Sequence, residues 1–370
     1  MALDLRRGVV ASVDRRGDSL LELTVAVGGE ERPAIAYRGL TGEAEPGDDV
    51  VVNTAALDLR LGSGGFDVVH VNLTRGLGAH ADPAALSMKL NYTSLQHGVE
   101  PVECAAEATD HARTGMPAFE DRAFAWPPRL DGRPVAVLAL HGQLEPVAWA
   151  AAQGAPRARV GYVQTAGGAL PGALSDAVRE LRARGLLAGH VTAAPAFHGE
   201  HEAMTVAGAL VAAFTALEWD AALVGPGPGI VGSGTALGHG GLAALDSAHA
   251  GLALGARTVL VPRMSSGDPR PRHRGLSHHT ATVLALLLRA AVVAWPAEEV
   301  SDLDREDRPL STHELRARPT DLEGYRATGL SSETMGCSID EEPLFFRAAL
   351  AGGAVLAEEI ARGGEERSDV

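Results

Sequence analysis

Short runs of alternating apolar and polar residues characterise the first 80 positions of the chain. Runs such as residues 19–27 and 49–54 are rich in β-branched side chains, and turn-forming stretches such as residues 46–49 separate them. Four to six strands at this spacing are typical of a small barrel or sandwich. The pattern therefore predicts a small β-barrel or sandwich over residues 1–80, which we interpret as a structural or assembly module rather than a catalytic one.

Continuous apolar runs and helical patterns alternate over residues 133–300, which predicts a parallel α/β domain. An unbroken apolar run such as residues 135–140 is typical of a strand that is buried on both faces of a parallel sheet. Strands that alternate with helices of this length indicate βαβ units with helices on both faces. The pattern predicts strands at residues 135–140, 159–165, 187–193, 220–225, 258–262 and 291–295, and helices at residues 145–153, 175–184, 200–218, 241–254 and 280–289.

The remaining segments are a connector and a C-terminal extension. Residues 81–132 have weak periodicity and are expected to connect the two domains. Residues 301–370 begin with a charged stretch and contain a helical pattern over residues 342–361, which we expect to pack back on the α/β domain. The expected fold is therefore α/β, with a doubly wound, mainly parallel sheet, an N-terminal small β-barrel domain and a C-terminal helical extension.

Composition and charge narrow the class of protein. The chain has 370 residues, of which 46% are hydrophobic, and a formal charge of −15. The acidic balance argues against nucleic-acid binding, because neutralising phosphates requires lysine and arginine. The longest apolar stretches are too short to span a bilayer, and the first residues lack a signal-peptide pattern. We therefore expect a cytoplasmic protein with no nucleic-acid or membrane partner, and we leave open whether it forms a homo-oligomer.

Unusual residues are concentrated in the loops that follow the predicted strands. In an open parallel sheet, ligands bind beyond the carboxyl ends of the strands. The loops at the opposite ends, such as residues 154–157 and 184–186, carry no comparable residues. The asymmetry predicts one composite site at the carboxyl edge of the sheet, built from residues 141–143, 165–171, 194–201, 225–235 and 263–280.

Residues 270–280 are the most unusual of these segments. They contain three arginines, three histidines, a serine and a threonine but no acid, in a chain that is acidic overall. Arginine binds phosphate or carboxylate through two parallel hydrogen bonds, and imidazole titrates near neutral pH. Ser277 is placed as the N-cap of the following helix, which explains it without a nucleophilic role. The segment therefore predicts an anion site with a histidine that transfers protons.

The leading hypothesis is an enzyme that hydrolyses, or transfers a group of, a small anionic molecule that is phosphorylated or carboxylated. Glycine-rich loops can bring backbone N–H groups close to an anion, although a tight structural turn explains the same glycines equally well. The candidate catalytic residues are His141, His278, His279 and Asp268. The candidate ligand-binding residues are Gln143, Thr165, Gly167, Gly168, Gly225, Gly227, Gly232, Ser233, Gly234, Thr235, Arg263, Arg272, His273 and Arg274.

Two other functions fit the sequence. One is a hydrolase dependent on a divalent metal, for which His198 and His201 are the candidate ligands, since catalytic zinc commonly takes three ligands of the histidine and carboxylate type. Adjacent histidines at a helix start are expected to point in different directions, so at most one of His278 and His279 would share a given centre. The other is a non-catalytic ligand-sensing or assembly protein, with the barrel as its platform.

Five motifs along the chain resemble those of a bacterial family of proteins of unknown function, DUF3866. They are Met-Lys-Leu-Asn-Tyr-Thr-Ser-Leu-Gln at residues 88–96, His-Gly-Gln-Leu-Glu-Pro at 141–146, Thr-Ala-Gly-Gly-Ala-Leu-Pro at 165–171, Gly-Pro-Gly at 225–227 and Arg-His-Arg-Gly-Leu-Ser-His-His-Thr at 272–280. The resemblance covers essentially the whole chain, and the last motif is the most specific. It implies a cytoplasmic bacterial protein of about this length, and it carries no catalytic residue or substrate over to this sequence.

Overall fold

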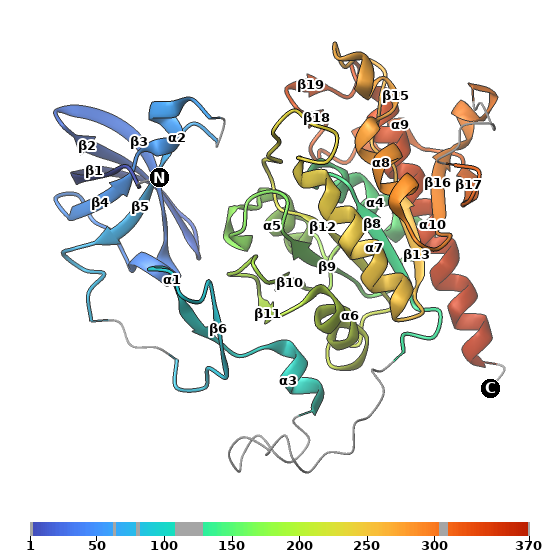
Figure 1. Cartoon of the computed structure of the whole chain (residues 1–370), viewed down its shortest axis with the longest axis horizontal. Helices are drawn as coiled ribbons and strands as arrows, with labels where there is room; N and C mark the ends of the chain where they lie inside the picture. Colours follow the sequence, from blue (N-terminus) through green and yellow to red (C-terminus); the bar gives the residue numbers. More distant parts are fainter. Residues whose placement is uncertain (1–2, 62–63, 79–81, 108–128, 303–309, 369–370) are drawn as a thin grey trace. The chain divides into compact units, whose positions relative to one another are not determined.

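The computed structural model describes residues 3–61, 64–78, 82–107, 129–302 and 310–368. Two units are distinguished along the chain, Met1–Val99 and Glu100–Val370 (Figure 1). Part of the predicted connector, residues 108–128, lies outside the described residues. Among the described helices, none is both long enough and apolar enough to span a membrane.

The first unit contains the predicted β-barrel. Its five strands close in the order β1-β2-β3-β5-β4, and only the β3–β5 pair is parallel. In β2, every second residue from Leu21 to Val27 is buried, because successive side chains of a strand point to opposite faces. The strands are β1 (Leu5–Arg16), β2 (Leu20–Val27), β3 (Glu30–Tyr37), β4 (Asp49–Asn53) and β5 (Asp67–Asn72), with the short helices α1 (Arg38–Thr41) and α2 (Ala55–Leu59) and the hairpin β6 (Ser87–Lys89) and β7 (His97–Val99).

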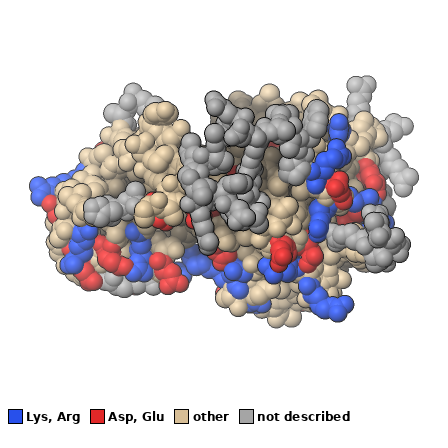
Figure 2. Space-filling view, turned by 90° about the horizontal axis from the view of Figure 1, so that it is seen from below, with Lys and Arg blue, Asp and Glu red and all other residues tan. Residues whose placement is uncertain are grey.

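Charged side chains of both signs are interspersed on the surface. On the face shown in Figure 2, Lys and Arg side chains lie next to Asp and Glu side chains. On the barrel, Arg7 pairs with Asp49, and Arg32 pairs with Asp67 and Asp58. Both of these arginines are thus engaged by neighbouring carboxylates.

The second unit is built on a parallel sheet of eight strands. Their order is β11-β10-β9-β12-β8-β13-β16-β17, and every adjacent pair is parallel. Because β12 and β13 flank β8, the loops after these two strands leave the same edge of the sheet on either side of β8. The strands are β8 (Pro134–Leu138), β9 (Val160–Thr165), β10 (His190–Ala193), β11 (His201–Ala203), β12 (Ala221–Pro226), β13 (Arg257–Val261), β16 (Val292–Pro296) and β17 (Glu314–Arg318).

Helices cover both faces of this sheet, which confirms the doubly wound α/β fold (Figure 1). Residues of β8 alternate between two cores: Val135 and Val137 face one, Ala136 and Leu138 the other. The helices α6 (Val206–Thr215), α7 (Ala243–Ala253) and α8 (His278–Leu286) lie on the first face, and α4 (Leu144–Gly154), α5 (Asp176–Ala183) and α10 (Pro343–Ser368) lie on the second. Two short helices, α3 (Val102–Glu107) and α9 (Leu322–Arg326), complete the unit.

Two elements differ from the sequence prediction. Residues 200–218 were expected to form one helix, but His201–Ala203 extend the sheet as β11 and the helix begins at Val206. The Thr205 side chain accepts a hydrogen bond from the Gly208 backbone and so caps this helix. The C-terminal extension supplies a strand as well as a helix, since β17 pairs with β16.

Candidate functional site

Four histidines come together where the loops after β12 and β13 meet. The rings of His239 and His279 stack with centroids 3.8 Å apart and planes inclined by 12°. His278 lies 4.4 Å from His279 and 5.4 Å from His239. His273 lies 4.8 Å from His278 and 4.9 Å from His279. We call His239, His273, His278 and His279 the histidine cluster.

The glycine-rich loop after β12 folds back on itself and ends at His239. Gly232 and His239 form an antiparallel bridge. The Gly240 backbone N–H donates to the Val231 carbonyl at 2.7 Å, and the Ser233 N–H donates to the Gly238 carbonyl at 2.6 Å. Gly234 adopts φ +78°, a left-handed conformation that glycine tolerates best. The loop therefore acts as a small hairpin that positions His239.

The loop after β13 positions the other three histidines. A two-residue ladder between β14 (Met264–Ser265) and β15 (Gly275–Leu276) closes it. Ser277 then caps α8, because its Oγ accepts from the His279 backbone N–H, which confirms the predicted N-cap. The same Oγ lies 2.8 Å from Nδ1 of His273. One serine thus orders both the start of the helix and the ring of His273.

Three members of the cluster could hold a metal ion. One ring nitrogen from each of His239, His278 and His279 lies within 4.8 Å of the others, and this is the one such group of histidines, cysteines and carboxylates that the described part of the chain contains. Both ring nitrogens of His239 are buried, and neither makes a well-formed hydrogen bond to the described residues, although the Ala236 backbone lies close. The arrangement offers three neutral nitrogen ligands and an unsatisfied polar ring.

The expectation that only one of His278 and His279 could share a centre is wrong. Both belong to the group of three. They are the first two residues of α8, where side chains incline toward the helix N-terminus and can extend beyond it. Their rings therefore meet past the end of the helix, with centroids 4.4 Å apart.

His198 and His201 lie elsewhere. Neither belongs to the group of three histidines found among the described residues. His201 is the first residue of β11 at the edge of the sheet, and the His198 backbone N–H donates to Oε1 of Glu202 at 2.6 Å.

Arginines and one aspartate surround the cluster. The buried guanidinium of Arg263 donates to Nδ1 of His279 at 3.2 Å and to Oδ2 of Asp268 at 3.2 Å. Because a guanidinium only donates, Nδ1 of His279 accepts here, and the proton of the neutral ring resides on Nε2. Arg270 donates to both carboxylate oxygens of Asp268, at 2.9 and 2.8 Å. Asp268 is therefore engaged by two arginines.

Burial and positive charge determine the protonation of the site. Burial, followed by the charges of neighbouring arginines and histidines, lowers the pKa of His279 to about 2 and that of His273 to about 4. Burial also lowers the pKa of Arg263 to about 10. Hydrogen bonding by Arg270 holds the pKa of Asp268 well below its usual range. The cluster is thus neutral at physiological pH, and Asp268 is ionised.

Two arginines of the loop face outward. Arg274 is exposed and donates from Nε to the backbone carbonyl of Asp268 at 3.0 Å. Arg272 is also exposed, and in the described part of the chain its side chain makes neither a hydrogen bond nor an ion pair. Its charge nevertheless contributes to the lowered pKa of His278, after burial and His239. Arg272 is therefore an exposed guanidinium of this loop that has no partner among the described residues.

His141 belongs to a different group. Its Nδ1 lies 3.0 Å from the Pro226 carbonyl, which only accepts, so this nitrogen carries the proton. Its Nε2 then accepts from the hydroxyl of Ser175 at 2.8 Å. Burial lowers the pKa of His141 to about 4. Both nitrogens of His141 are thus occupied by the protein itself.

Gln143 connects the ends of two strands. Its Oε1 accepts from the backbone N–H groups of Ala139 and Leu140 at 2.9 and 3.0 Å, and its Nε2 donates to the Pro262 carbonyl at 2.9 Å. The side chain is completely buried. These bonds hold the carboxyl ends of β8 and β13 together.

The glycines of the two glycine-rich loops allow backbone to pack against backbone. A Cβ added at Gly168 would overlap the Gly227 carbonyl, and one added at Gly167 would overlap the Gly240 carbonyl. A Cβ at Gly225 would come within 2.9 Å of Leu138. These contacts account for Gly167, Gly168 and Gly225 as packing positions.

The hydroxyl groups of the same loops bond locally. Ser233 Oγ lies 3.0 Å from Thr235 Oγ1, which accepts from the Gly238 N–H, and the Thr165 hydroxyl donates to the Ala166 carbonyl at 3.0 Å. They stabilise the loops in which they occur.

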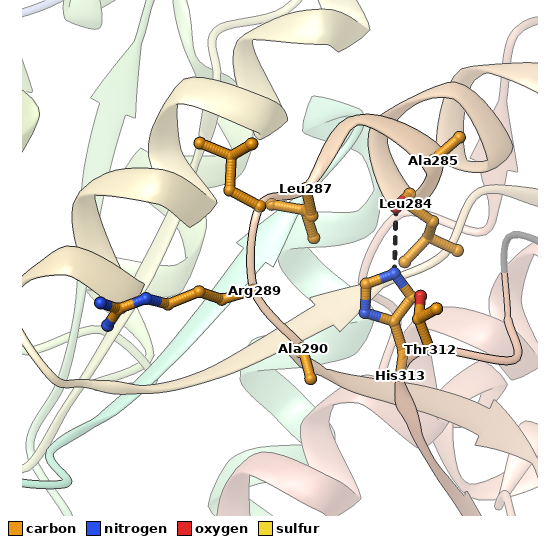
Figure 3. A pocket seen from close by; sticks show the side chains of 8 residues that line it. Leu284, Ala285, Leu287, Arg289, Ala290, Thr312 and His313 are labelled. Atoms are coloured by element: carbon orange, nitrogen blue, oxygen red, sulfur yellow. Dashed lines mark hydrogen bonds between the residues drawn. The ribbon is translucent and has the colours of Figure 1, made fainter.

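A hollow of about 420 Å³ lies at the opposite end of α8 from the cluster. His313 in its wall accepts from the Ala291 N–H and donates from Nε2 to the Leu284 carbonyl at 3.0 Å, the bond drawn in Figure 3. Arg289 points away from this histidine in the same view. Because His313 uses both nitrogens to join α8 to the segment before β17, we interpret the hollow as structural.

Two residues important to the site were not predicted. His239 lies in a glycine-flanked stretch between a predicted strand and a helix, which was the available signal. Glu342 lies far along the chain, and its sequence context contained no signal of a role in the site. Its buried carboxylate accepts from Ser265 Oγ at 2.7 Å, from the Ser266 N–H at 3.0 Å and from the Gly267 N–H at 3.2 Å, so the C-terminal extension holds the loop after β13.

Comparison with known proteins gives the family. The profile of a family described as a protein of unknown function, DUF3866, matches residues 33–353. No curated protein and no solved structure matches the chain. The family match covers most of the 370 residues, including all of the histidine cluster. The chain therefore belongs to the DUF3866 family of proteins of unknown function.

Proposed function

We propose that this protein is a metal-dependent enzyme that acts on a small anionic molecule, by hydrolysis or group transfer. The observation that carries the proposal is the group of three imidazole nitrogens, from His239, His278 and His279, within 4.8 Å of one another. Three neutral histidines and one open position are a usual ligand set for catalytic zinc. Such an ion lowers the pKa of a bound water to about 7, which would supply a nucleophile at neutral pH.

Binding an ion requires two adjustments in the cluster. The rings of His239 and His279 are nearly parallel, so their in-plane lone pairs do not converge until one ring rotates. Arg263 must also release His279, because Nδ1 either binds the ion itself or takes up the proton that leaves Nε2. Metal binding would therefore be coupled to movement of these side chains.

Arg272 would bind the anion. It is exposed, carries no partner among the described residues and acts electrostatically on His278. A guanidinium binds carboxylate or phosphate through two parallel hydrogen bonds. The proposal includes a cytoplasmic location without nucleic-acid or membrane partners, and the formal charge of −15 supports the absence of a nucleic-acid partner.

Zinc stoichiometry in the full-length protein, purified without an affinity tag, tests the proposal. We expect about one zinc per chain by elemental analysis, and its loss in the His239→Ala and His278→Ala variants, since each removes one of three ligands. His201→Ala is the matched control and should retain zinc. Protein that takes up no divalent ion would refute the proposal, and loss of zinc in His201→Ala alone would move the site to β11.

A measurement of turnover distinguishes an enzyme from a ligand sensor. Zinc-loaded protein is incubated with small phosphate and carboxylate esters, and release of product is compared with the His239→Ala variant. Product release that needs His239 supports the enzyme. A ligand that binds zinc-loaded protein tightly and leaves unchanged would support the sensor instead.

A further inference from the structure

We infer that the anion taken by the histidine cluster and Arg272 is a phosphate group, as in a phosphate monoester, rather than a singly charged carboxylate. This inference rests on the proposed function, because it places the phosphate beside the ion bound by His239, His278 and His279. The charges that face the site narrow the substrate class from small anions in general to those that carry a phosphate group.

The ligand set leaves the charge of the ion uncompensated. All three candidate ligands are imidazoles, which bind metal in their neutral form. The nearby carboxylates are directed elsewhere. Asp268 accepts from Arg263 and Arg270, and Glu342 accepts from Ser265 and the two residues that follow it. A divalent ion in the cluster would therefore keep both positive charges available to a substrate.

The loop itself carries an excess of positive charge. Residues 263–280 contain four arginines, at positions 263, 270, 272 and 274, and one acid, Asp268. If Glu342 is included because it bonds to this loop, four positive charges face two negative ones, and the difference is two. The rest of the chain is strongly acidic, so this excess opposes the overall charge and concentrates attraction for anions at one place.

The guanidinium of Arg263 lies directly against the cluster, because it donates to Nδ1 of His279 at 3.2 Å, and it contributes positive potential there. The start of α8 adds to it, since a helix N-terminus carries partial positive charge, and α8 has nine residues. The potential at the cluster is thus positive from several independent sources.

A phosphate monoester matches these charges better than a carboxylate does. It carries between one and a half and two negative charges near neutral pH, with a second pKa of about 6, and offers three oxygen acceptors. One oxygen could bind the ion while two others accept hydrogen bonds from two N–H groups of Arg272. A carboxylate has one charge and two oxygens. In hydrolysis, the oxygen of water forms a bond to phosphorus, the ester P–O bond breaks, and the alcohol departs with a proton from the water.

Titration calorimetry of full-length protein with inorganic phosphate and with acetate tests the inference. We expect zinc-loaded protein to bind phosphate at least about tenfold more tightly than acetate, since an added charge-assisted hydrogen bond contributes about 1.5 kcal/mol or more. Arg272→Gln should lower phosphate affinity about tenfold by the same reasoning. Arg289→Gln, an exposed arginine at the other end of α8, is the matched control and should bind phosphate as the parent protein does.

The outcomes separate this inference from the proposed function. Acetate binding as tight as phosphate binding overturns the inference, as does an Arg272→Gln variant that keeps its phosphate affinity or an equal loss in Arg289→Gln. If zinc binds but phosphate is not preferred, the metal site stands and only the phosphate assignment falls. If no zinc binds, the proposed function fails and this inference fails with it.

Discussion

Replacing Arg263 with methionine should increase the affinity of the histidine cluster for zinc. Arg263 donates to Nδ1 of His279 at 3.2 Å. If Nδ1 binds the ion, its lone pair is no longer available to the guanidinium; if Nε2 binds, the proton of the ring moves to Nδ1 and opposes the same donor. Zinc and Arg263 therefore compete for His279 in either case.

The size of the effect follows from the bond that zinc must displace. A hydrogen bond that involves a charged group contributes about 1.5–3 kcal/mol. At about 1.4 kcal/mol for each factor of ten, Arg263→Met should bind zinc roughly 10- to 100-fold more tightly. Removing a positive charge beside the ion acts in the same direction. Methionine keeps much of the packing of this buried side chain, and Asp268 retains Arg270 as a partner.

The assay is a competition titration of metal-free protein against a chromophoric chelator, after circular dichroism has verified that the variant is folded. Arg270→Met is the matched control, because Arg270 also bonds to Asp268 but makes no hydrogen bond to His279 in the described structure. Its zinc affinity should rise much less than that of Arg263→Met, because it loses a nearby charge but no hydrogen bond to His279. Folded Arg263→Met that binds zinc no more tightly than the parent protein would refute the competition.

Three further predictions concern stability. His141 has a folded-state pKa of about 4 against 6.5 when unfolded, so the unfolded state binds more protons below pH 6.5, and stability should be full above pH 6.5 and fall as the pH drops toward 4. Other buried histidines such as His273 add to this loss, and the share of His141 in the fall of the unfolding free energy in urea between pH 7 and pH 5 should be about 2 kcal/mol. A His141→Asn variant whose total fall equals that of the parent protein would exclude this contribution. Glu342→Gln should cost about 1–3 kcal/mol, because it replaces one of the two buried oxygens that accept from three donors with an NH2 group, which can only donate. The exposed Glu341→Gln should cost much less, and urea unfolding of both variants measures the difference. Gly168→Ala should lower the melting temperature by several degrees, since its Cβ would overlap the Gly227 carbonyl; an unchanged melting temperature would mean that the two loops are not packed as described.

The strands and the helix starts were predictable because their signals are local. Strands β8, β12 and β16 are continuous apolar runs, and the two buried faces of a parallel sheet favour that composition. Ser277 was predicted as an N-cap because capping depends on residues next to it in sequence. The strand β11 was missed because its three residues become a strand only by pairing with β10.

The sequence allowed a prediction of where a site would lie, but not of which side chains would meet there. A parallel sheet collects the loops that follow its strands, so the sequence pointed to five loops, among them those after β12 and β13. It could not show that the rings of His239 and His279 stack, because forty residues separate them and only folding brings the two loops together. Nor could it show that both nitrogens of His141 are engaged by the protein, since Ser175 and Pro226 come from other loops.

The sequence by itself thus determined the α/β architecture, the edge of the sheet where the unusual residues gather and the positive charge of residues 263–280. The tertiary structure alone decided which histidines share a centre, that Asp268 is engaged by arginines and that Glu342 holds the loop from far along the chain. The physical reason is the range of each interaction. Hydrophobic periodicity and capping act between near neighbours in sequence, whereas a ligand set depends on the distances between side chains that loops from different strands bring together.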